Sequence, residues 1–536
     1  MDSSLARLSV AIVVSTLAWK YIIYPLFFSP LASIPAAHPL AHFTSLWIEW
    51  HRLRGTDFQK VSEAFATKGP HLRLGPRDIA VNDIESVSCV WGAGVADFDK
   101  HPSYVYWKTQ GMVNTFTSVL GPEHRRRHRR IRGVHKRSYI ASSPHIRAIM
   151  SNLMVERLLP LFGQVATSSN GTVNILPVAQ AIIMDCTSAF AFGVPLSLNF
   201  ITDAAARYQW FELFKVAFPN NQDLFWLREH PHITRVLRFL GIPVISGKIA
   251  GARREFESWA LPKVDAAEEV MQRHDRGQPV ALGEFPVLYD AIRSDLVPTN
   301  NDGAKASFTM TPHQRRELAS ECLDHIAFTA EAFGTVFAYI IYELSRHPDI
   351  QSELRAELRA AENPLIGNGD APIDVPASET LERLPFLGAV VKECLRLRNT
   401  SPNADPRVTP SHPCRIGPLM AIPPKTRVCS YGWCLHRNPD VYADPLTWNP
   451  RRWLPGGSDD PALAKKWFFA FGAGSRNCIG QHLAVELMRM SLATVYTNYA
   501  TSIANETEYP GANKPMSSDL VEKLIVKFEK VSLAEC

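Results

Sequence analysis

The chain has 536 residues, of which 46% are hydrophobic, and its Lys and Arg outnumber Asp and Glu by 57 to 52. The resulting net charge of +5 is too small to indicate nucleic-acid binding by itself, and the length allows a large hydrophobic core. The nine cysteines are scattered, without a Cys-x-x-Cys pair, so the sequence indicates neither a zinc site nor a disulfide framework.

Residues 1–30 are predicted to form an N-terminal membrane anchor. The stretch from Leu5 to Phe28 is mostly apolar, and about 20 residues suffice to cross a bilayer. Lys20 stands among aromatic residues, as expected of a cation that reaches the lipid headgroups. The alternative is a cleaved signal peptide, but the prolines that follow favour a stiff Pro-rich neck over residues 31–41.

Residues 42–536 are predicted to form one mainly α-helical catalytic domain with a small β-sheet region. Leu72-Arg73-Leu74-Gly75-Pro76, followed by Ile79-Ala80-Val81, predicts a β-hairpin. The turn-rich stretch 277–301 is interpreted as a surface connection.

The clearest predicted helix is long and buried. Thr311 is a good N-cap and Pro312 a good first residue, and the helix is expected to run to Arg346, before Pro348. Its middle, 326–341, is apolar on nearly all sides, so we expect it to lie inside the protein.

The segment from Phe471 to Gly480 places a single cysteine, Cys478, in a glycine-rich loop. The glycines allow tight bends that bring backbone N–H groups toward the sulfur. An apolar helix begins just after Cys478, and its dipole is expected to lower the pKa of the thiol. The simplest alternative is a buried cysteine after a turn, but a thiolate placed in this way can bind heme iron, and Arg476 can neutralise a heme propionate.

The loop resembles that of the cytochrome P-450 family of heme-thiolate monooxygenases, whose pattern Phe-x-x-Gly-x-Arg-x-Cys-x-Gly is met at every fixed position. The matching residues are Phe471, Gly474, Arg476, Cys478 and Gly480. The resemblance implies the helical, triangular-prism fold of the family and a heme b whose iron is bound by Cys478. It also implies that Phe471, Gly472, Arg476 and Gly480 lie beside this cofactor.

Glu393 and Arg396 are three residues apart, so a helix places them on one face as an ion pair. Such pairs are common on surfaces, but the apolar residues around this one favour burial. The resemblance adds a Pro-rich turn, met by Ser401-Pro402, and the segment Pro450-Arg451-Arg452-Trp453. It implies that Arg452 joins Glu393 and Arg396 in a structural network.

The basic run from His124 to Arg132 has several interpretations. It could be a nucleic-acid patch, although no set of aromatic residues for stacking accompanies it, or a solvated helix face. The resemblance instead implies that His124 and Arg129 contact a heme propionate, while the other cations face a reductase. The usual spacing of the family would place a cation at His128, and Arg407 matches a further propionate contact.

The long helix departs from the family at its oxygen-activating pattern, Ala/Gly-Gly-x-Asp/Glu-Thr, which falls on Phe328-Thr329-Ala330-Glu331-Ala332. The acid is retained as Glu331, but the threonine that delivers protons has become Ala332. Thr329 and Thr335 lie about one turn to either side, so either hydroxyl can act in its place through a water. We therefore expect Glu331, Thr329 and Thr335 to be catalytic.

The resemblance implies a single-pass protein of the endoplasmic reticulum membrane with a cytosolic catalytic domain. Electrons would come from NADPH through an NADPH-cytochrome reductase, with cytochrome b5 as an optional partner. The expected substrate is a lipophilic small molecule, as for fungal members that modify secondary metabolites, and Phe328 is expected to face its chamber. On the cytosolic side, the sequons at Asn170, Asn399 and Asn505 would stay unmodified.

Two other functions remain open on the sequence. One is a heme-thiolate isomerase, dehydratase or oxidative-coupling enzyme, for which the altered helix would reflect chemistry without ordinary proton delivery. The other is a non-catalytic heme-binding protein, for which a membrane anchor and a reductase-facing basic surface have no obvious purpose.

Overall fold

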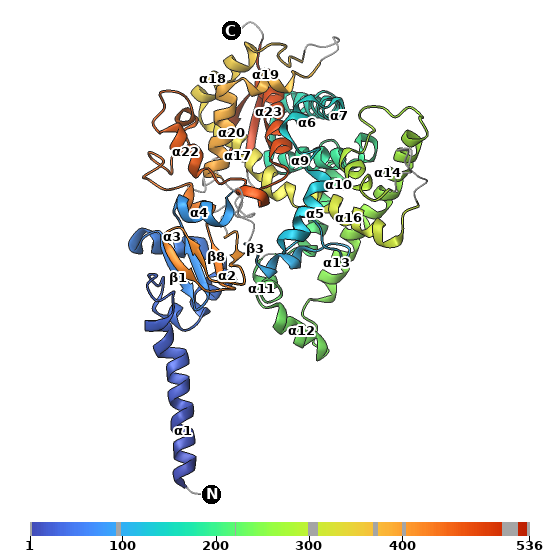
Figure 1. Ribbon diagram of the computed structural model, residues 1–536. Coiled ribbons are helices and arrows are strands. Elements are labelled where there is room, and N and C mark those ends of the chain that lie inside the picture. Colours follow the sequence, from blue (N-terminus) through green and yellow to red (C-terminus); the bar gives the residue numbers. More distant parts are fainter. Residues whose placement is uncertain are drawn as a thin grey trace.

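The computed structural model describes residues 3–92, 98–219, 221–297, 309–367, 374–398, 404–505 and 524–532. Within them the fold is mainly helical, and the strands gather in small sheets (Figure 1). The N-terminal helix projects away from the sheet region, and the remaining helices form the bulk of the molecule (Figure 1). These features confirm the predicted mainly α fold with a small β region.

The α-helices are α1 (Ser3–Ala18), α2 (Leu46–Arg54), α3 (Asp57–Lys68), α4 (Ile84–Trp91), α5 (Gly121–Ile131), α6 (Arg137–Ser142), α7 (Pro144–Ser151), α8 (Leu159–Thr167), α9 (Ile175–Phe192), α10 (Ala204–Ala217), α11 (Asn221–Glu229), α12 (Pro231–Phe239), α13 (Gly247–Ser258), α14 (Ala260–Asp275), α15 (Val287–Arg293), α16 (Pro312–Ala327), α17 (Thr335–Arg346), α18 (Pro348–Arg359), α19 (Ser378–Glu382), α20 (Pro385–Leu397), α21 (Gly432–Leu435), α22 (Pro461–Trp467) and α23 (Gln481–Asn498). The π-helical and 3-10 turns are η1 (Trp19–Phe28), η2 (Pro39–His42), η3 (Pro102–Trp107), η4 (Asn152–Leu158), η5 (Val194–Leu196), η6 (Ala330–Gly334), η7 (Pro450–Trp453) and η8 (Gly474–Arg476). The strands are β1 (His71–Gly75), β2 (Asp78–Val81), β3 (Asp99–Lys100), β4 (Thr172–Asn174), β5 (Arg407–Val408), β6 (Cys414–Ile416), β7 (Leu419–Ile422), β8 (Arg427–Cys429), β9 (Tyr499–Ile503) and β10 (Ile525–Lys530).

The largest sheet has the strand order β1-β2-β8-β5-β3. The predicted hairpin is confirmed, because β1 and β2 pair antiparallel with His71 opposite Val81. At the other edge β3 pairs antiparallel with β5, and Lys100 lies directly opposite Arg407. Like charges directly across a strand pair are destabilising unless an anion compensates them. The sheet therefore brings two cations together at one edge.

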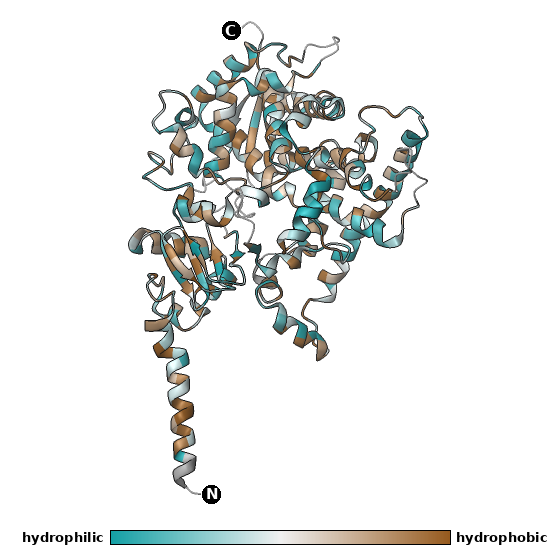
Figure 2. Ribbon diagram, viewed as in Figure 1, coloured by the Kyte–Doolittle hydropathy of each residue, from teal (hydrophilic) through white to brown (hydrophobic). Residues whose placement is uncertain are grey.

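The predicted anchor is an exposed apolar rod. Of the three helical stretches that are long and apolar enough to cross a membrane in the described chain, only Arg7–Phe28 has none of its residues buried. Figure 2 shows hydrophobic residues along this rod. Its end is joined to the sheet, because Nη1 of the buried Arg73 donates a hydrogen bond of 2.9 Å to the carbonyl of Pro25.

The predicted neck, residues 31–41, packs against the sheet. Leu31 and Ile34 are buried in a hydrophobic cluster with residues of the sheet. The backbone N–H of Arg73 donates to the carbonyl of Pro35, at 2.8 Å, and Ala37 donates back to the carbonyl of Arg73. Residues 31–41 therefore hold the anchor close against strand β1.

The long buried helix is interrupted. Thr311 caps α16 as predicted, and its hydroxyl accepts a hydrogen bond from the backbone N–H of Gln314. The helix ends at Ala327, widens into the π-helical turn η6 and resumes as α17. The hydroxyl of Thr329 donates to the carbonyl of Ile326, at 2.8 Å, and so competes with the backbone ladder. The expectation of one continuous helix is corrected at this point.

The stretch 277–301 also needs correction. It contains helix α15, whose residues Leu288 and Tyr289 are fully buried, and the buried Arg293 pairs with Glu268. Residues 298–301 lie outside the described part of the chain. The short core helix α15 was not predicted, because the residues before it are typical of turns.

Candidate active site

The structure contains a cavity of about 420 Å³. The cysteine loop and the start of α23 line one part of it, and α16 and η6 line another. Phe333 of η6 and Phe471 of the loop face each other, with ring centroids 5.9 Å apart. The predicted site residues that line this cavity are Phe471, Gly472, Arg476, Cys478, Gly480, Arg407, His124 and Thr329. The structure thus gathers at one cavity residues that are hundreds of positions apart in the sequence.

The loop holds Cys478 with its backbone. The N–H of Cys478 donates to the carbonyl of Phe471, at 2.8 Å. Burial raises the pKa of the thiol to about 11, and the backbone N–H groups of Gly480 and Gln481 only partly offset this. The expectation of a lowered pKa is therefore wrong for the protein alone, since desolvation outweighs the helix terminus. A cation bound at the sulfur would reverse the balance, because metal coordination deprotonates a thiol.

Two glycines shape this loop and a third leaves room beside it. Gly474 has φ +64°, and a Cβ there would lie 2.2 Å from the carbonyl oxygen of Trp91. Gly472 also has a positive φ, of +68°. At Gly480, in contrast, a Cβ would meet nothing within 4 Å, and this residue faces the cavity. The loop is tightly packed on the side of α4 and open on the side where a flat cofactor would approach.

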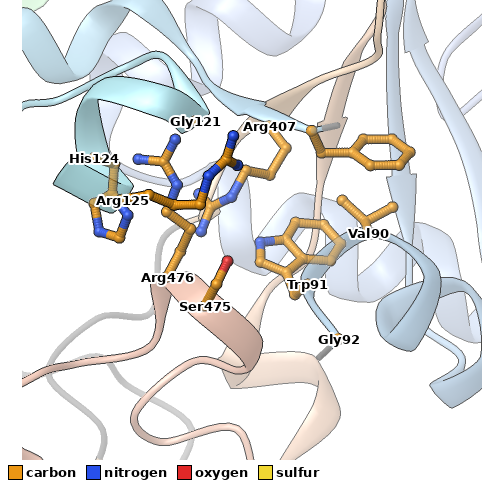
Figure 3. Close-up of a pocket in the computed structure, with 10 residues that line it drawn as sticks. Val90, Trp91, Gly92, Gly121, His124, Arg125, Arg407, Ser475 and Arg476 are labelled. Atoms are coloured by element: carbon orange, nitrogen blue, oxygen red, sulfur yellow. The ribbon is translucent and has the colours of Figure 1, made fainter. Parts of the chain in front are cut away.

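Three cations, of which Lys100 and Arg407 are buried and Arg476 is partly buried, converge on the edge of the cavity, where His124 also lies. Lys100, Arg407 and Arg476 all line it, and Arg125 points into a small adjoining pocket shared with Arg407 and Arg476 (Figure 3). Arg476 donates to the carbonyls of Ser118 and Val119, at 2.7 and 2.9 Å. Lys100 donates to the carbonyl of Phe116, at 2.7 Å. We call Lys100, Arg407 and Arg476 the open cation cluster.

The pKa values of this region are lowered first by burial and then by neighbouring positive charges. Burial, followed by the charge of Arg407, lowers the pKa of Arg476 to about 10 and that of Lys100 to about 7. Burial and the charge of Arg476 lower the pKa of His124 to about 2. Asp405 is bound bidentately by Arg407, with contacts of 2.5 and 2.9 Å. These residues fit a ligand that brings carboxylates to this edge, as the propionates of heme would.

The basic residues of helix α5 have different surroundings: some pair with α16, some line the cavity and some are exposed. Arg127 and Arg130 both bind Glu317 of α16, at 3.0 and 2.8 Å, and so hold the helix in place. His128 lines the cavity and stacks on His124. Arg129 is exposed and lies outside the cavity lining found in the described residues. Arg129 therefore does not lie at the cavity, where it was expected, whereas His124 and His128 both do.

The predicted network around Glu393 is closed and buried. Arg396 binds Glu393 with two hydrogen bonds of 2.7 and 2.8 Å, and Arg452 adds a third of 3.1 Å. Trp453 donates its indole N–H to Glu393, at 2.9 Å. Arg452 also pairs with Asp459, at 2.6 Å. Ser401 and Pro402, the predicted turn after this helix, lie outside the described residues.

His436 links this network to the cysteine loop, a role that the sequence pattern did not reveal. Its Nδ1–H donates to the carbonyl of Arg396, at 3.0 Å, and its Nε2 accepts from the backbone N–H of Phe469, at 2.8 Å. Burial and the charges of Arg396 and Arg437 lower the pKa of His436 to about 3. The neutral imidazole of His436 therefore connects the Glu393 network, through Arg396, to the backbone at the start of the cysteine loop.

The three predicted proton-delivery residues have different positions. Thr329 lines the cavity, next to Ala332, and its hydroxyl lies 3.5 Å from that of Thr187 on α9. Thr335 is buried outside the lining formed by the described residues. Glu331 is exposed over part of its surface, while desolvation of its carboxyl raises the pKa of that group.

Phe328 does not line this cavity within the described residues. It packs instead in an aromatic cluster with Trp107 and Phe218, with ring centroids 5.2 and 5.4 Å away. This cluster joins η3, α10 and the end of α16. Phe328 therefore belongs to this aromatic cluster, and the expectation that it faces the chamber is not met in the described residues.

Comparisons with known proteins agree with this geometry. The cytochrome P450 family model matches residues 42–525. The cytochrome P450 monooxygenase ankB of Aspergillus thermomutatus is 25% identical over 90% of this chain and 85% of its own. The cytochrome P450 monooxygenase avaI of Aspergillus versicolor is 26% identical, over 80% and 94% of the two chains. The fusicoccadiene C-8 hydroxylase of Alternaria brassicicola is 24% identical, over 90% and 87%. The chain belongs to the cytochrome P450 family, as a heme-thiolate monooxygenase.

Proposed function

We propose that this monooxygenase oxidises a lipophilic secondary-metabolite intermediate at a membrane, with electrons that a reductase takes from NADPH. The observation that carries the proposal is a single cysteine, Cys478, at a largely apolar cavity whose edge holds the open cation cluster. The name of the relative in Alternaria brassicicola assigns it a hydroxylation of fusicoccadiene, which supports the substrate class.

The residues that line the cavity would have three roles in this proposal: to bind the iron, to bind the propionates and to exclude water. When bound, heme supplies the activation of dioxygen, and the cysteine thiolate promotes O–O cleavage. Cys478 would hold the iron, while Arg407, Arg476, Lys100, His124 and His128 would hold the propionates. The apolar side chains of α23 at the cavity, among them Leu487, would exclude water from the cofactor face.

Proton delivery is proposed to use Thr329 in place of the missing threonine. Its hydroxyl faces the cavity beside Ala332, whereas Thr335 is buried away from it. Glu331, with its raised pKa and access to water, would exchange protons with solvent. Placed acid–base groups commonly contribute about 10²–10⁴ in rate, so the Thr329 hydroxyl is expected to matter.

The exposed cations of α5 are proposed to bind the reductase, and cytochrome b5 would use the same surface. Arg126 and Arg129 are exposed on this helix, while the neighbouring Arg127 and Arg130 are committed to Glu317. A positive surface attracts an acidic partner, and the attraction weakens with salt.

Membrane attachment is proposed to involve two apolar surfaces. The rod of α1 and η1 would span the endoplasmic reticulum membrane with the catalytic domain in the cytosol. Helix α12 exposes Ile233, Val236 and Phe239 at 48, 57 and 90% of their surfaces, at helical spacing on one face. Both elements extend toward the same end of the molecule (Figures 1 and 2). Lipophilic substrates would then enter from the bilayer.

The central experiment replaces the proposed iron ligand. Cys478→Ser should abolish the long-wavelength Soret band of the reduced carbonyl complex, since only a thiolate ligand gives it. Cys89→Ser is the matched control, because Cys89 is partly accessible, as Cys478 is from the cavity, but lies outside the cavity lining of the described residues. Retention of the band in Cys478→Ser would refute the assignment.

Turnover decides between oxygen insertion and the other heme-thiolate chemistries. Membranes that carry the protein and a reductase should consume NADPH and dioxygen with candidate lipophiles, whereas an isomerase or dehydratase would convert its substrate without NADPH. Thr329→Ala should increase peroxide release per NADPH by about tenfold, and Thr335→Ala should not. Equal leakage in both variants would remove Thr329 as the relay.

Topology is tested in the same membranes. Protease added to intact microsomes should digest the catalytic domain, and the sequon residues Asn170, Asn399 and Asn505 should carry no glycan. Protection from protease or sensitivity to a glycosidase would place the domain in the lumen. Asn399 lies outside the described residues.

A further inference from the structure

A second polar feature of the cavity is left unexplained by the proposed cofactor contacts. The carboxyl of Asp324, on α16, lines the cavity and has no hydrogen bond or ion pair among the described residues. The neighbouring ring of His325 donates from Nδ1 to the carbonyl of Glu321, at 2.9 Å, which leaves its buried Nε2 without a partner in the described part of the protein. The propionates of heme are anionic and would not be drawn to an acid, so Asp324 requires another explanation.

A loop that packs against α16 offers a matching polar atom. Thr115 also lines the cavity, and its buried hydroxyl has no hydrogen-bond partner within the described residues. Its backbone N–H donates to both carboxylate oxygens of Glu321, at 3.1 Å each. Glu321 lies one helical turn before Asp324, so this bond holds Thr115 against the helix face that carries Asp324. Buried polar groups without partners are costly, which indicates that a ligand or water completes them.

We propose that Asp324 and Thr115 form a polar subsite that binds an uncharged oxygen substituent, a hydroxyl or carbonyl, on an otherwise apolar substrate. The inference rests on the proposed function and specifies its substrate class. It implies that the substrate arrives already oxygenated, from an earlier oxygenation or an oxygen-containing scaffold, and that the subsite sets which carbon lies near the iron.

The charges around the subsite favour a neutral ligand. Burial, reinforced by Glu321, raises the pKa of Asp324 well above its ordinary value, which favours a carboxylic acid that can donate a hydrogen bond. The charge of Lys100 acts on Asp324, and the charges of Arg407 and Arg476 act in turn on Lys100. These cations would repel a substrate ammonium group, whereas a hydroxyl or carbonyl can accept from Asp324.

The test uses imidazole probes, because an imidazole nitrogen can bind the heme iron whatever group stands at the other end of the probe. A series of N-alkylimidazoles of graded chain length is prepared with a methyl, ketone or ammonium end, and each is titrated into heme-loaded full-length protein by its Soret shift. At one or more chain lengths the ketone-ended probe should bind about tenfold more tightly than the methyl-ended probe. Asp324→Leu should remove this preference, while Asp324→Asn, which keeps a donor, should retain most of it.

Thr115→Val provides an independent arm, since it removes the hydroxyl at nearly constant shape and should reduce the ketone preference several-fold. The ratio between probes is insensitive to a general loss of stability, which would affect all three ends alike. A preference for the ammonium end, no preference at any chain length, or an unchanged ketone preference in Asp324→Leu would overturn the subsite. Absence of any imidazole-induced Soret shift would instead contradict the heme-thiolate function.

Discussion

Two clusters of buried or partly buried cations in this protein have opposite charge balances. In the closed network Arg396 and Arg452 are satisfied by Glu393 and Asp459, all at 0–1% exposure. In the open cluster Lys100 and Arg476 are bound only to backbone carbonyls in the described structure, and Arg407 alone has a carboxylate partner. Buried charge is costly unless paired. The closed network therefore has the character of scaffold, and the open cluster that of a binding site for an anionic group.

The largest effect is expected from breaking the closed network. Glu393→Gln would leave Arg396 and Arg452 buried without their shared anion, so the free energy of unfolding should fall by about 3–5 kcal/mol. Chemical denaturation of the protein measures it. Asp265→Asn is the control, since Asp265 pairs with Arg315 on the surface and its loss should cost less than about 1 kcal/mol. Equal losses in the two variants would contradict the scaffold role.

In the open cluster, the loss of a positive charge should stabilise the protein without heme, whereas in the closed network the loss of a charge destabilises it. The pKa of Lys100 falls from 10.5 to about 7 on folding without heme. Between these pH values the unfolded chain binds the proton and the folded chain does not, so the apoprotein should gain stability as pH rises from 7 to 10.5, on the order of 3 kcal/mol. Lys100→Met should lose this pH dependence and release heme about tenfold faster.

Lys60→Met is the matched control for that measurement, because Lys60 forms an exposed pair with Glu63. Its unfolding profile should follow that of the wild type. If Lys100→Met kept the full gain with pH, or held heme as tightly as the wild type, the open cluster would not be the anion site.

His436 tests how the closed network reaches the cysteine loop. Its pKa is about 3 in the folded protein against 6.5 as a free side chain. The unfolded chain therefore takes up a proton first as pH falls from 6.5 toward 3, and this single group should cost about 2 kcal/mol of stability at pH 5. In His436→Gln this part of the acid sensitivity should disappear in equilibrium unfolding, while identical acid profiles would refute it.

The smallest effect is expected outside both clusters. Arg129→Glu should leave heme content unchanged and raise the KM for the reductase only a few-fold, with the difference fading at high salt. His128→Ala, one residue away but at the cavity, should weaken heme retention instead. Heme loss in Arg129→Glu would restore the propionate role that the structure does not support.

Local patterns were sufficient for much of the fold. Pro312 after Thr311 predicted where α16 begins, and the fixed positions around Cys478 predicted the loop that faces the cavity, because these features depend on neighbours in the sequence. The interruption at Thr329 was not predicted, since it arises when a side-chain hydroxyl competes for the carbonyl of Ile326. The buried helix α15 was missed because its burial comes from contacts with distant helices.

The candidate site divides in the same way. The ligand cysteine and the Glu393–Arg396 pair were evident from spacing, which is a local property. Lys100, Thr115 and Asp324 carry no pattern of their own, because their roles arise from β3, the following loop and α16 meeting around one cavity. The helix face that distinguishes His128 from Arg129 is likewise decided by how α5 docks on Glu317.

The sequence by itself determined the family, the cysteine proposed as iron ligand, the apolar N-terminal segment and the replacement at Ala332, because each depends on the identity or spacing of nearby residues. Only the tertiary structure decided which cations lack an anion, which hydroxyl faces the cavity and where an unpaired acid lies. Those properties depend on desolvation and on distances between residues far apart in the chain, and both are set when the elements pack.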